Sequence, residues 1–322
     1  MGLANRSCPN CRSRRFAARE PGCEITRQIG LRSDFILRHF DYHPEPAELM
    51  DLTRFMHGGP GRLVACAVCG LVVREEDEQP DYARDVYDRD LLAHLYPRYV
   101  QAFREKECQY RGLLPARAEV IELGSHLGAF LEVAEEWDWR PTGLDIGEYT
   151  GAFSRAKGLR VLPQTIEDAR VCSHAADGLF IWNCFEQIDA PGSTLRQAHR
   201  LLKPHGLLVV RTPNFQFYER WRRGIVEGSA RALQELAYNN LLGFPYLTGY
   251  SPRTLSGLLR SHGFEPVAGF DSALLTVPFP ELPRTVGRAA EAHRRFAEGR
   301  GRQPEGLSGP WIEIACRRAA NS

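Results

Sequence analysis

The feature that most constrains the fold is an alternation of short apolar runs with helix-length segments between about residues 117 and 212. Short apolar runs separated by such segments predict buried parallel strands that are joined by right-handed helical crossovers. We therefore expect an α/β fold with a Rossmann-like, doubly wound and mostly parallel sheet. The predicted strands are residues 119–123, 142–144, 160–162, 178–182, 206–212, 263–267 and 311–316, and the helices among the first five are about residues 128–137, 150–157 and 193–202.

One helical segment is predicted from apolar periodicity, and two helices are predicted with the help of their boundary residues. Apolar side chains at three- and four-residue spacings predict a helical segment at residues 82–112. Ser193 predicts the cap of a helix that Lys203-Pro204 would stop. Ser251, with Pro252 at the first helical position, predicts one more helix, because proline needs no amide donor there.

The first predicted strand runs directly into a glycine turn and a helix start, from Glu122 to Gly128. Glycine at Gly124 lets a ligand approach the main chain closely, and the amides of a helix start bind carboxylates and phosphates. About twenty residues later the next strand ends on Asp145, which is placed to accept hydrogen bonds from both hydroxyls of a ribose. The two features together predict a site for an adenosine-containing cofactor at the carboxyl edge of the sheet.

Five sequence elements resemble those of class I S-adenosylmethionine-dependent methyltransferases in order and spacing. The likeness covers roughly residues 117–212 and, more faintly, Gly263-Phe264, and it is closest to the small-molecule and sugar-modifying branch. It implies an enzyme that moves a methyl group from S-adenosylmethionine to a small-molecule or sugar acceptor. An NAD-dependent dehydrogenase fits the later elements poorly. The elements are Glu122-Leu-Gly-Ser-His-Leu-Gly128, Gly143-Leu-Asp145, Asp177-Gly-Leu-Phe-Ile181, Arg200-Leu-Leu-Lys-Pro-His-Gly206 and Val209-Val-Arg-Thr-Pro-Asn214.

The resemblance also implies which residues contact the cofactor. The glycine turn would hold the methionine part, and the acid after the second strand would bind the ribose. A turn after the third strand would face the adenine, and the residue after the fourth strand would bind the methionine carboxylate. These residues are, in that order, Glu122, Gly124 and Gly128, then Asp145, then Thr165-Ile166-Glu167, then Asn183; we also assign Ser125 and Ile146 to the cofactor site.

Two departures from the family pattern bear on the chemistry. His126 stands where the family usually has a middle glycine, and we expect its side chain to point away, so that only its backbone matters. The chain has Glu186-Gln187 where the family often has Glu-His, which removes a natural general base. Methylation is still feasible, because the sulfonium is already activated and orientation supplies much of the acceleration. The candidate acid–base or orienting groups are Gln187, His205, Tyr96 and Tyr218.

Two Cys-x-x-Cys pairs, Cys8 with Cys11 and Cys66 with Cys69, predict a structural Zn²⁺ site with four thiolate ligands. Similar zinc-bearing segments accompany some sugar C-methyltransferases, which the arrangement resembles. The long stretch between the pairs requires an inserted sheet or loop, and residues 71–73 after the second pair are strand-like. Two unrelated surface pairs or a redox dithiol are the alternatives. We expect the remaining cysteines to be buried apolar residues: Cys23, Cys108, Cys172, Cys184 and Cys316.

We divide the chain into a zinc-ribbon-like domain at residues 1–80, a helical linker or lid at 81–116, and a methyltransferase domain at 117–322. The acidic run at residues 74–80 is interpreted as a linker, and the aromatic residues at about 214–250 as an insertion. Aromatic side chains of the lid and the insertion, with nearby arginines for a phosphate, are candidate walls of an acceptor pocket; ordinary packing and solvated charge are the alternative. They are Tyr82, Tyr87, Tyr96, Tyr99, Tyr218, Arg220, Arg222 and Arg223.

The overall charge and hydropathy restrict the partners and the location. The chain has 41 basic and 40 acidic side chains, a formal net charge of +1, which makes nucleic acid an unfavoured substrate. It has no apolar stretch of membrane-spanning length and no apolar signal core at its amino terminus, so we expect a cytoplasmic protein without membrane contact.

Two other functions are consistent with the sequence. The chain could instead be an RNA or protein methyltransferase that binds its macromolecular substrate through the zinc module. The sequence evidence for this is limited to the arginines between Arg12 and Arg19. A non-catalytic relative would keep the fold as a scaffold. The sequence does not distinguish O-, N- and C-methylation, and it gives no oligomeric state.

Overall fold

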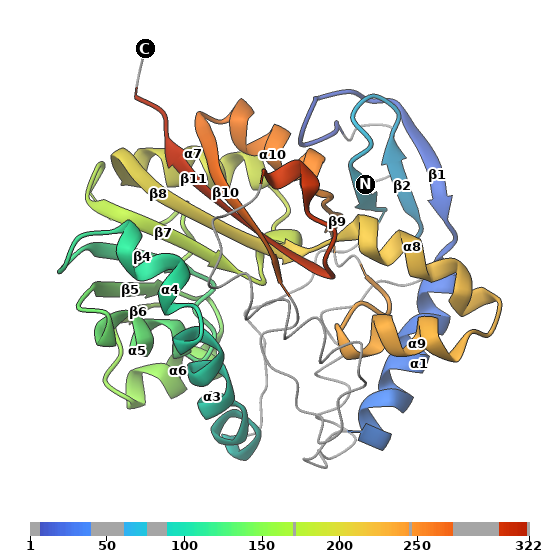
Figure 1. Cartoon of the computed structure of the whole chain (residues 1–322), viewed down its shortest axis with the longest axis horizontal. Helices are drawn as coiled ribbons and strands as arrows, with labels where there is room; N and C mark the ends of the chain where they lie inside the picture. Colours follow the sequence, from blue (N-terminus) through green and yellow to red (C-terminus); the bar gives the residue numbers. More distant parts are fainter. Residues whose placement is uncertain are drawn as a thin grey trace.

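The computed structural model describes residues 7–39, 61–75, 89–169, 172–244, 247–272 and 303–320. Within these ranges the chain forms a seven-stranded sheet and a smaller four-stranded sheet (Figure 1). No helix in the same ranges is both long and apolar enough to cross a membrane.

The large sheet has the strand order β10-β11-β8-β7-β4-β5-β6. The five strands from β4 to β8 are parallel, while β11 is antiparallel to β8 and β10 antiparallel to β11. This arrangement confirms the predicted mostly parallel, Rossmann-like sheet. Its strands are β4 (Glu119–Leu123), β5 (Arg140–Leu144), β6 (Val161–Leu162), β7 (Ala176–Trp182), β8 (Leu202–Pro213), β10 (Phe264–Ser272) and β11 (Trp311–Arg318).

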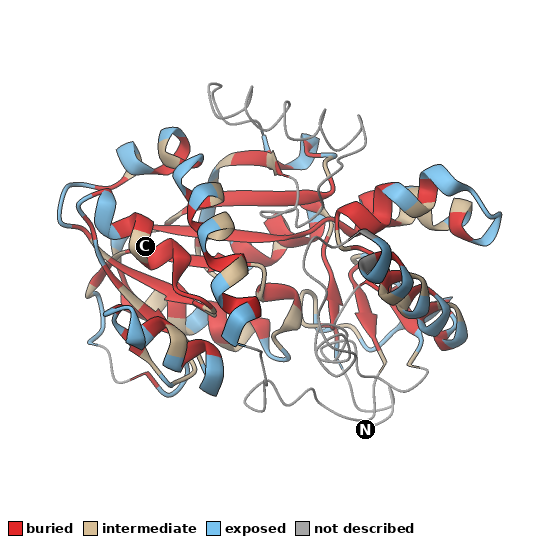
Figure 2. Cartoon of the chain, turned by 90° about the horizontal axis from the view of Figure 1, so that it is seen from below, coloured by how far each residue is buried: buried red, intermediate tan, exposed pale blue. Residues whose placement is uncertain are grey.

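Helices cover both faces of this sheet, because successive residues of a buried strand point to opposite sides. Val120 and Phe180 pack into one apolar cluster with α3 and α5, while Ile121 and Ile181 pack into another with α7 and α10. Figure 2 shows the strands buried and the outer faces of the helices exposed. The helices are α3 (Arg89–Arg104), α4 (Glu107–Tyr110), α5 (Ala129–Glu136), α6 (Glu148–Ala156), α7 (Pro191–Leu201) and α10 (Pro252–Ser261).

The helix boundaries agree with the prediction in part. Ser251 accepts from the amide of Thr254, whose hydroxyl accepts in turn from the amide of Ser251, so the predicted cap is a full capping box. The predicted cap Ser193 is wrong, because α7 begins two residues earlier at Pro191, where a missing amide costs nothing. The helical segment predicted at 82–112 is divided into α3, α4 and a short 3-10 turn, and residues 82–88 lie outside the described ranges.

The small sheet combines three strands from the amino-terminal part of the chain with one strand from the predicted insertion. Its strand order is β1-β2-β3-β9, all antiparallel, and β9 lies at the end of that insertion. The stretch between the cysteine pairs contains a helix, α1, rather than only the expected sheet or loop, and residues 40–60 lie outside the described ranges. The elements are β1 (Phe16–Glu20), α1 (Gly22–His39), β2 (Leu63–Cys66), β3 (Val72–Arg74), α8 (Phe215–Val226), α9 (Ala230–Tyr238) and β9 (Thr248–Gly249).

The amino-terminal module and the insertion share a buried polar cluster. The Tyr218 hydroxyl on α8 lies 3.1 Å from Glu20 Oε2 and 3.0 Å from Gln28 Oε1, and the Gly243 amide donates to the same Gln28 oxygen. Figure 1 shows α1 beside α9, where Phe35 meets Tyr238 edge to face. The predicted linker assignment of Arg74 is wrong: the residue ends β3, is buried, and donates to the Gly243 carbonyl.

A buried charge network joins the α3–α4 connection to the centre of the sheet. Glu313 on β11 pairs with Lys106, lies 3.3 Å from Arg211 Nε on β8, and accepts a 2.6 Å hydrogen bond from the Tyr110 hydroxyl. All four side chains are fully buried. Burial lowers the pKa of Lys106 and lowers that of Arg211 to about 10, while Glu313 opposes both shifts. Glu313 therefore offsets part of the free-energy cost of burying these two cations.

Glu313→Gln should lower the free energy of unfolding by about 3 kcal/mol, because it removes the carboxylate that both buried cations face. Urea unfolding at pH 7 measures the change. Glu119→Gln, which breaks the exposed Glu119–Arg140 pair, is the matched control and should cost less than about 1 kcal/mol. Similar losses in the two variants would contradict the assignment.

Candidate functional site

The turn after β4 has a backbone that two of its glycines make possible. Gly124 and Gly128 have φ of 68° and 73°, in the left-handed region. A Cβ at Gly124 would lie 2.7 Å from Cys184 Sγ, and one at Gly128 would lie 2.6 Å from Leu159 Cδ1. The turn is therefore packed tightly against the connection between α6 and β6, which contains Leu159, and against the loop that follows β7.

Asp145, at the end of β5, holds this turn to the start of α6. Its Oδ2 accepts from the His126 amide at 2.6 Å, and its Oδ1 accepts from the Gly147 amide at 2.8 Å and the Thr150 hydroxyl at 3.1 Å. The His126 carbonyl accepts from Ser154 Oγ at 3.0 Å. Both backbone groups of His126 are thus hydrogen-bonded, which supports the left-handed conformation of this residue, whose φ is 46°.

Four buried polar atoms around this turn have no hydrogen-bond partner among the described residues. They lie at the carboxyl ends of three parallel strands: β4 and β7, which pair with each other, and β6, which β5 separates from β4. A buried donor or acceptor without a partner costs about 1–3 kcal/mol, so four such atoms along one edge of the sheet indicate a place for a polar ligand. The atoms are Glu122 Oε2, Ser125 Oγ, Gln164 Oε1 and Asn183 Oδ1.

Glu122 has the most perturbed environment of these groups. Its side chain is almost fully buried at the end of β4. Burial, followed by the nearby charge of Asp145, raises the pKa of Glu122 well above its usual value. A ligand that presents an ammonium or hydroxyl group here would supply the partner that the carboxyl group lacks.

The loop after β7 lies against the same turn. Asn183 adopts a φ of 54°, and its carbonyl accepts from Gln187 Nε2 at 3.0 Å. The Cys184 thiol donates to the Leu123 carbonyl at 3.3 Å. Glu186 is fully buried, and its Oε2 lies 3.4 Å from Thr212 Oγ1. Burial raises the pKa of Glu186 to about 7.

The residues predicted to face the adenine lie at the same edge with different exposures. The Thr165 hydroxyl donates to Asp168 Oδ2 at 2.8 Å and accepts from the Asp168 amide. Ile166 is buried in the core, whereas Ile146, next to Asp145, has 41% of its surface exposed. Sequence reasoning missed Gln164, because an isolated glutamine after a strand carries no periodic or motif signal.

Of the four candidate acid–base groups, Gln187 is hydrogen-bonded to the carbonyl of Asn183, one of the predicted cofactor residues. The Tyr96 hydroxyl on α3 is hydrogen-bonded to Glu132 on α5, and Tyr218 is buried against the amino-terminal module. His205 lies at the amino end of β8, at the opposite edge of the sheet. Of the proposed pocket walls, Tyr82 and Tyr87 lie outside the described residues.

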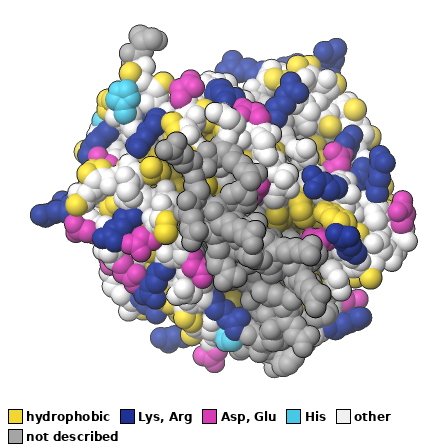
Figure 3. Space-filling model, viewed as in Figure 1, with side chains coloured by type: hydrophobic (Ala, Val, Ile, Leu, Met, Phe, Trp, Pro, Cys, Tyr) yellow, Lys and Arg dark blue, Asp and Glu magenta, His cyan; other side chains and the backbone are white. Residues whose placement is uncertain are grey.

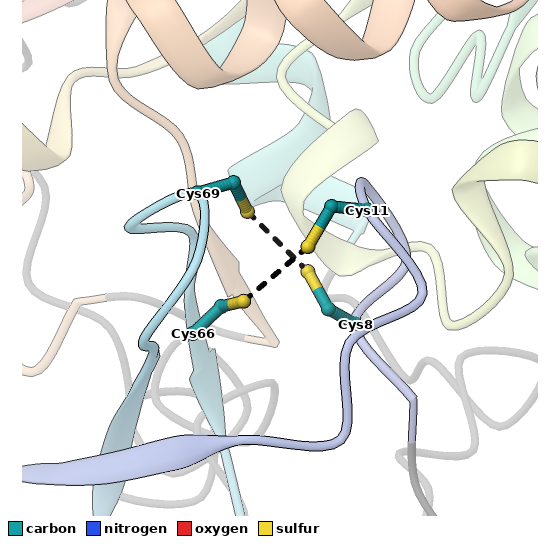
Figure 4. Close-up of side chains that lie close together, drawn as sticks. All are labelled: Cys8, Cys11, Cys66 and Cys69. Carbon is teal, nitrogen blue, oxygen red and sulfur yellow. Dashed lines mark hydrogen bonds between the residues drawn. The ribbon is translucent and has the colours of Figure 1, made fainter.

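Four cysteine thiols converge between the turn before β1 and the turn from β2 to β3 (Figure 4). Their sulfur atoms all lie within 4.8 Å of one another; the sulfurs of Cys8 and Cys69 are 3.5 Å apart, and those of Cys11 and Cys66 are 3.4 Å apart. Burial raises the pKa of Cys8 and Cys69. Burial also acts to raise that of Cys66, but backbone hydrogen bonds at Cys69 and Val68 lower it to about 7.

A four-thiol group of this size suits a tetrahedral soft-metal site with no open position. Among the described residues, these four cysteines are the set of His, Cys, Asp or Glu side chains that lie close enough together to bind one metal ion. The prediction that the other cysteines are buried is wrong for Cys23, Cys108 and Cys172, which are exposed.

The chain is similar to methyltransferases in several comparisons with known proteins. A family model described as a methyltransferase domain matches residues 87–268. No curated protein matches the chain. Similar solved structures are S-adenosylmethionine-dependent methyltransferases from Thermotoga maritima (16% identity, 71% of this chain and 95% of that chain, TM-score 0.46) and Aquifex aeolicus (13%, 73% and 100%, 0.46). Geranyl diphosphate C-methyltransferase from Streptomyces coelicolor is also similar (15%, 74% and 87%, 0.46).

Glu186→Gln should make the protein more stable at pH 8 and less sensitive to pH. In the folded chain the pKa of Glu186 is about 7, against an ordinary 4.5, so its contribution to stability is lost as the pH rises through about 7. The variant should exceed the wild type by about 2 kcal/mol at pH 8 and by much less at pH 5. Parallel curves of unfolding free energy against pH would contradict this account.

Proposed function

Because the chain belongs to the methyltransferase-domain family and is an S-adenosylmethionine-dependent methyltransferase, we propose that its acceptor is a small organic molecule or a sugar. The further proposal that the cofactor binds at the turn after β4 is carried by one observation: four buried polar atoms without described partners lie at the carboxyl ends of β4, β6 and β7.

The proposed contacts follow from this geometry. Glu122, Ser125 and the amides of the glycine turn would hold the amino-acid part of the cofactor, with Asn183 between its two charged groups, Nδ2 donating to the carboxylate and Oδ1 accepting from the ammonium. Asp145 would bind the ribose, since each carboxylate oxygen has two lone pairs and Oδ2 is used by one described donor. Ile146 offers exposed apolar surface to the adenine, beside Thr165 and Ile166.

When bound, the cofactor supplies a methyl group on a positively charged sulfur. The residues of this chain would orient that group and keep water from it, which accounts for much of the acceleration in such displacements. Gln187 is the candidate that lies near enough to orient an acceptor. His205 lies at the opposite edge of the sheet, Tyr218 is buried against the amino-terminal module, and the Tyr96 hydroxyl is hydrogen-bonded to Glu132 on α5.

Charge distribution supports a small acceptor over a nucleic acid. The chain as a whole has a formal net charge of +1, and basic and acidic side chains are interspersed on the face shown in Figure 3. Arg19 pairs with Glu219, and Arg222 lies 3.8 Å from the buried Glu20, so neither belongs to an uninterrupted basic surface. Phe215, Tyr218 and Phe244 of the insertion are buried, so they pack in the core that the insertion shares with the amino-terminal module rather than form the wall of a pocket.

Asn183→Gly should weaken the binding of S-adenosylmethionine about tenfold, because it removes the amide proposed to contact the cofactor carboxylate. Glycine accepts the φ of 54°, so the melting temperature should change little. Calorimetric titration measures the affinity. Asn240→Gly is the matched control, since Asn240 has a φ of 58° at the end of α9, and it should bind normally. Equal affinities in both variants would remove Asn183 from the site.

We also propose that Cys8, Cys11, Cys66 and Cys69 bind one structural Zn²⁺. The purified protein should contain about one zinc per chain, and Cys66→Ser with Cys69→Ser should lose it and melt at a lower temperature. Elemental analysis and thermal unfolding measure the two effects. Cys108→Ser with Cys172→Ser changes two exposed thiols outside the cluster and should keep the metal. A chain of full stability without metal would show that the proposal is wrong.

A further inference from the structure

Residues 247–250 lie between the four-cysteine module and the loop that follows β7, and they contact both. They contain β9, the strand that completes the small sheet, and end on Tyr250, which is fully buried. No sequence motif indicates this segment. It provides a physical connection between the cysteine cluster and the proposed cofactor site.

On one side the segment is bound to the strand that follows the second cysteine pair. Val72 pairs with Gly249, and Val73 pairs with Thr248. The Leu247 carbonyl also accepts from the Arg74 amide at 2.8 Å. Because β3 begins three residues after Cys69, the turn that carries this thiol sets the position of the strand and hence of β9.

On the other side the segment holds the loop after β7. The Leu247 amide donates to the Glu186 carbonyl at 3.2 Å. The Tyr250 ring stacks on Phe185, with 5.3 Å between centroids and 28° between planes. Both rings pack in the apolar cluster that contains Cys8 and Cys66. Phe185 and Glu186 follow closely on Asn183, so their anchoring restricts where Asn183 can lie.

A third contact prevents the segment from sliding along the strand. The Phe215 amide donates to the Tyr250 carbonyl at 2.8 Å. A Cβ at Gly249 would lie 2.6 Å from Phe215 Cδ2 on α8, so any residue larger than glycine would clash at this position. Backbone movement at Tyr250 would therefore break contacts with β3, α8 and the Asn183 loop together.

We propose that Tyr250 is a positioning residue for the methyl-donor site, which holds the loop of Asn183 in place and is itself held by the four-cysteine sheet through β9. The inference rests on the proposed function, since Asn183 matters here as a contact of the donor. Asn183 has a left-handed backbone, a conformation that costs free energy outside glycine and therefore needs support from its surroundings.

The test compares Tyr250→Leu, which removes the stacked ring, with Tyr250→Phe, which keeps it. Amide hydrogen exchange is followed at Gln187 and Ile188, whose amides donate to the carbonyls of Cys184 and Phe185. In Tyr250→Leu these amides should exchange faster, and S-adenosylhomocysteine should bind about tenfold more weakly. Amides of β4 should stay protected, which shows that the sheet is folded. Tyr250→Phe should behave as the wild type in both measurements.

A second arm acts at the cysteine cluster. Cys66→Ser with Cys69→Ser should accelerate exchange at the same two loop amides, while β4 keeps its protection. Cys108→Ser makes the same change at an exposed thiol outside the cluster and should leave the loop amides unchanged.

The outcomes separate this inference from the proposed function. Unchanged loop exchange in Tyr250→Leu, or faster exchange with unchanged affinity for S-adenosylhomocysteine, would overturn the positioning role. If the wild-type chain itself fails to bind S-adenosylhomocysteine, the proposed cofactor site is wrong. The exchange measurements then still decide whether Tyr250 and the cysteine sheet hold the loop.

Discussion

The reversal of strand order at β4 is the constraint on which the proposed site depends. With β5 and β6 on one side and β7 and β8 on the other, the loops after these strands leave the sheet at a common edge. The register of the parallel strands aligns their carboxyl ends, since Glu122 on β4 is opposite both Gly143 on β5 and Phe180 on β7. Asp145 then bridges two of the loops through the His126 and Gly147 amides. The buried polar atoms without described partners lie at one edge of the sheet because the parallel strands that precede or carry them end at that edge.

The amino-terminal module depends on the same framework. Its fourth strand is β9, and its buried Glu20 and Gln28 find their hydroxyl partner in Tyr218. These contacts join residues about two hundred positions apart, so the module and the insertion complete each other's cores. The division of the chain at residue 80 stays a prediction, but the shared core indicates that the two parts are stabilised together.

Local patterns predicted the central strands and several helices, because burial on alternate faces leaves a periodic record in the chain. β4 has the predicted bounds, and the other central strands differ mainly in length at their ends. The errors concern residues whose roles are set by distant partners. The sequence predicts that Arg74 begins a linker, but Arg74 is buried and donates a hydrogen bond to the Gly243 carbonyl. The hydroxyls of Tyr96 and Tyr218, two candidate acid–base groups, are hydrogen-bonded to Glu132 and Glu20, and a part for them in catalysis stays a prediction.

The amino-acid sequence by itself determined the fold class, the glycine turn with its following acid, and the two cysteine pairs, because each is encoded by neighbouring residues at short spacing. Only the tertiary structure decided between one group of four thiols and two separate cysteine pairs, and only it shows that β9 closes the small sheet and that Tyr250 stacks on Phe185. It also decided that Glu186 is buried, which raises its pKa. Such contacts depend on which distant segments the packed core brings together, and no local period or motif in the chain records them.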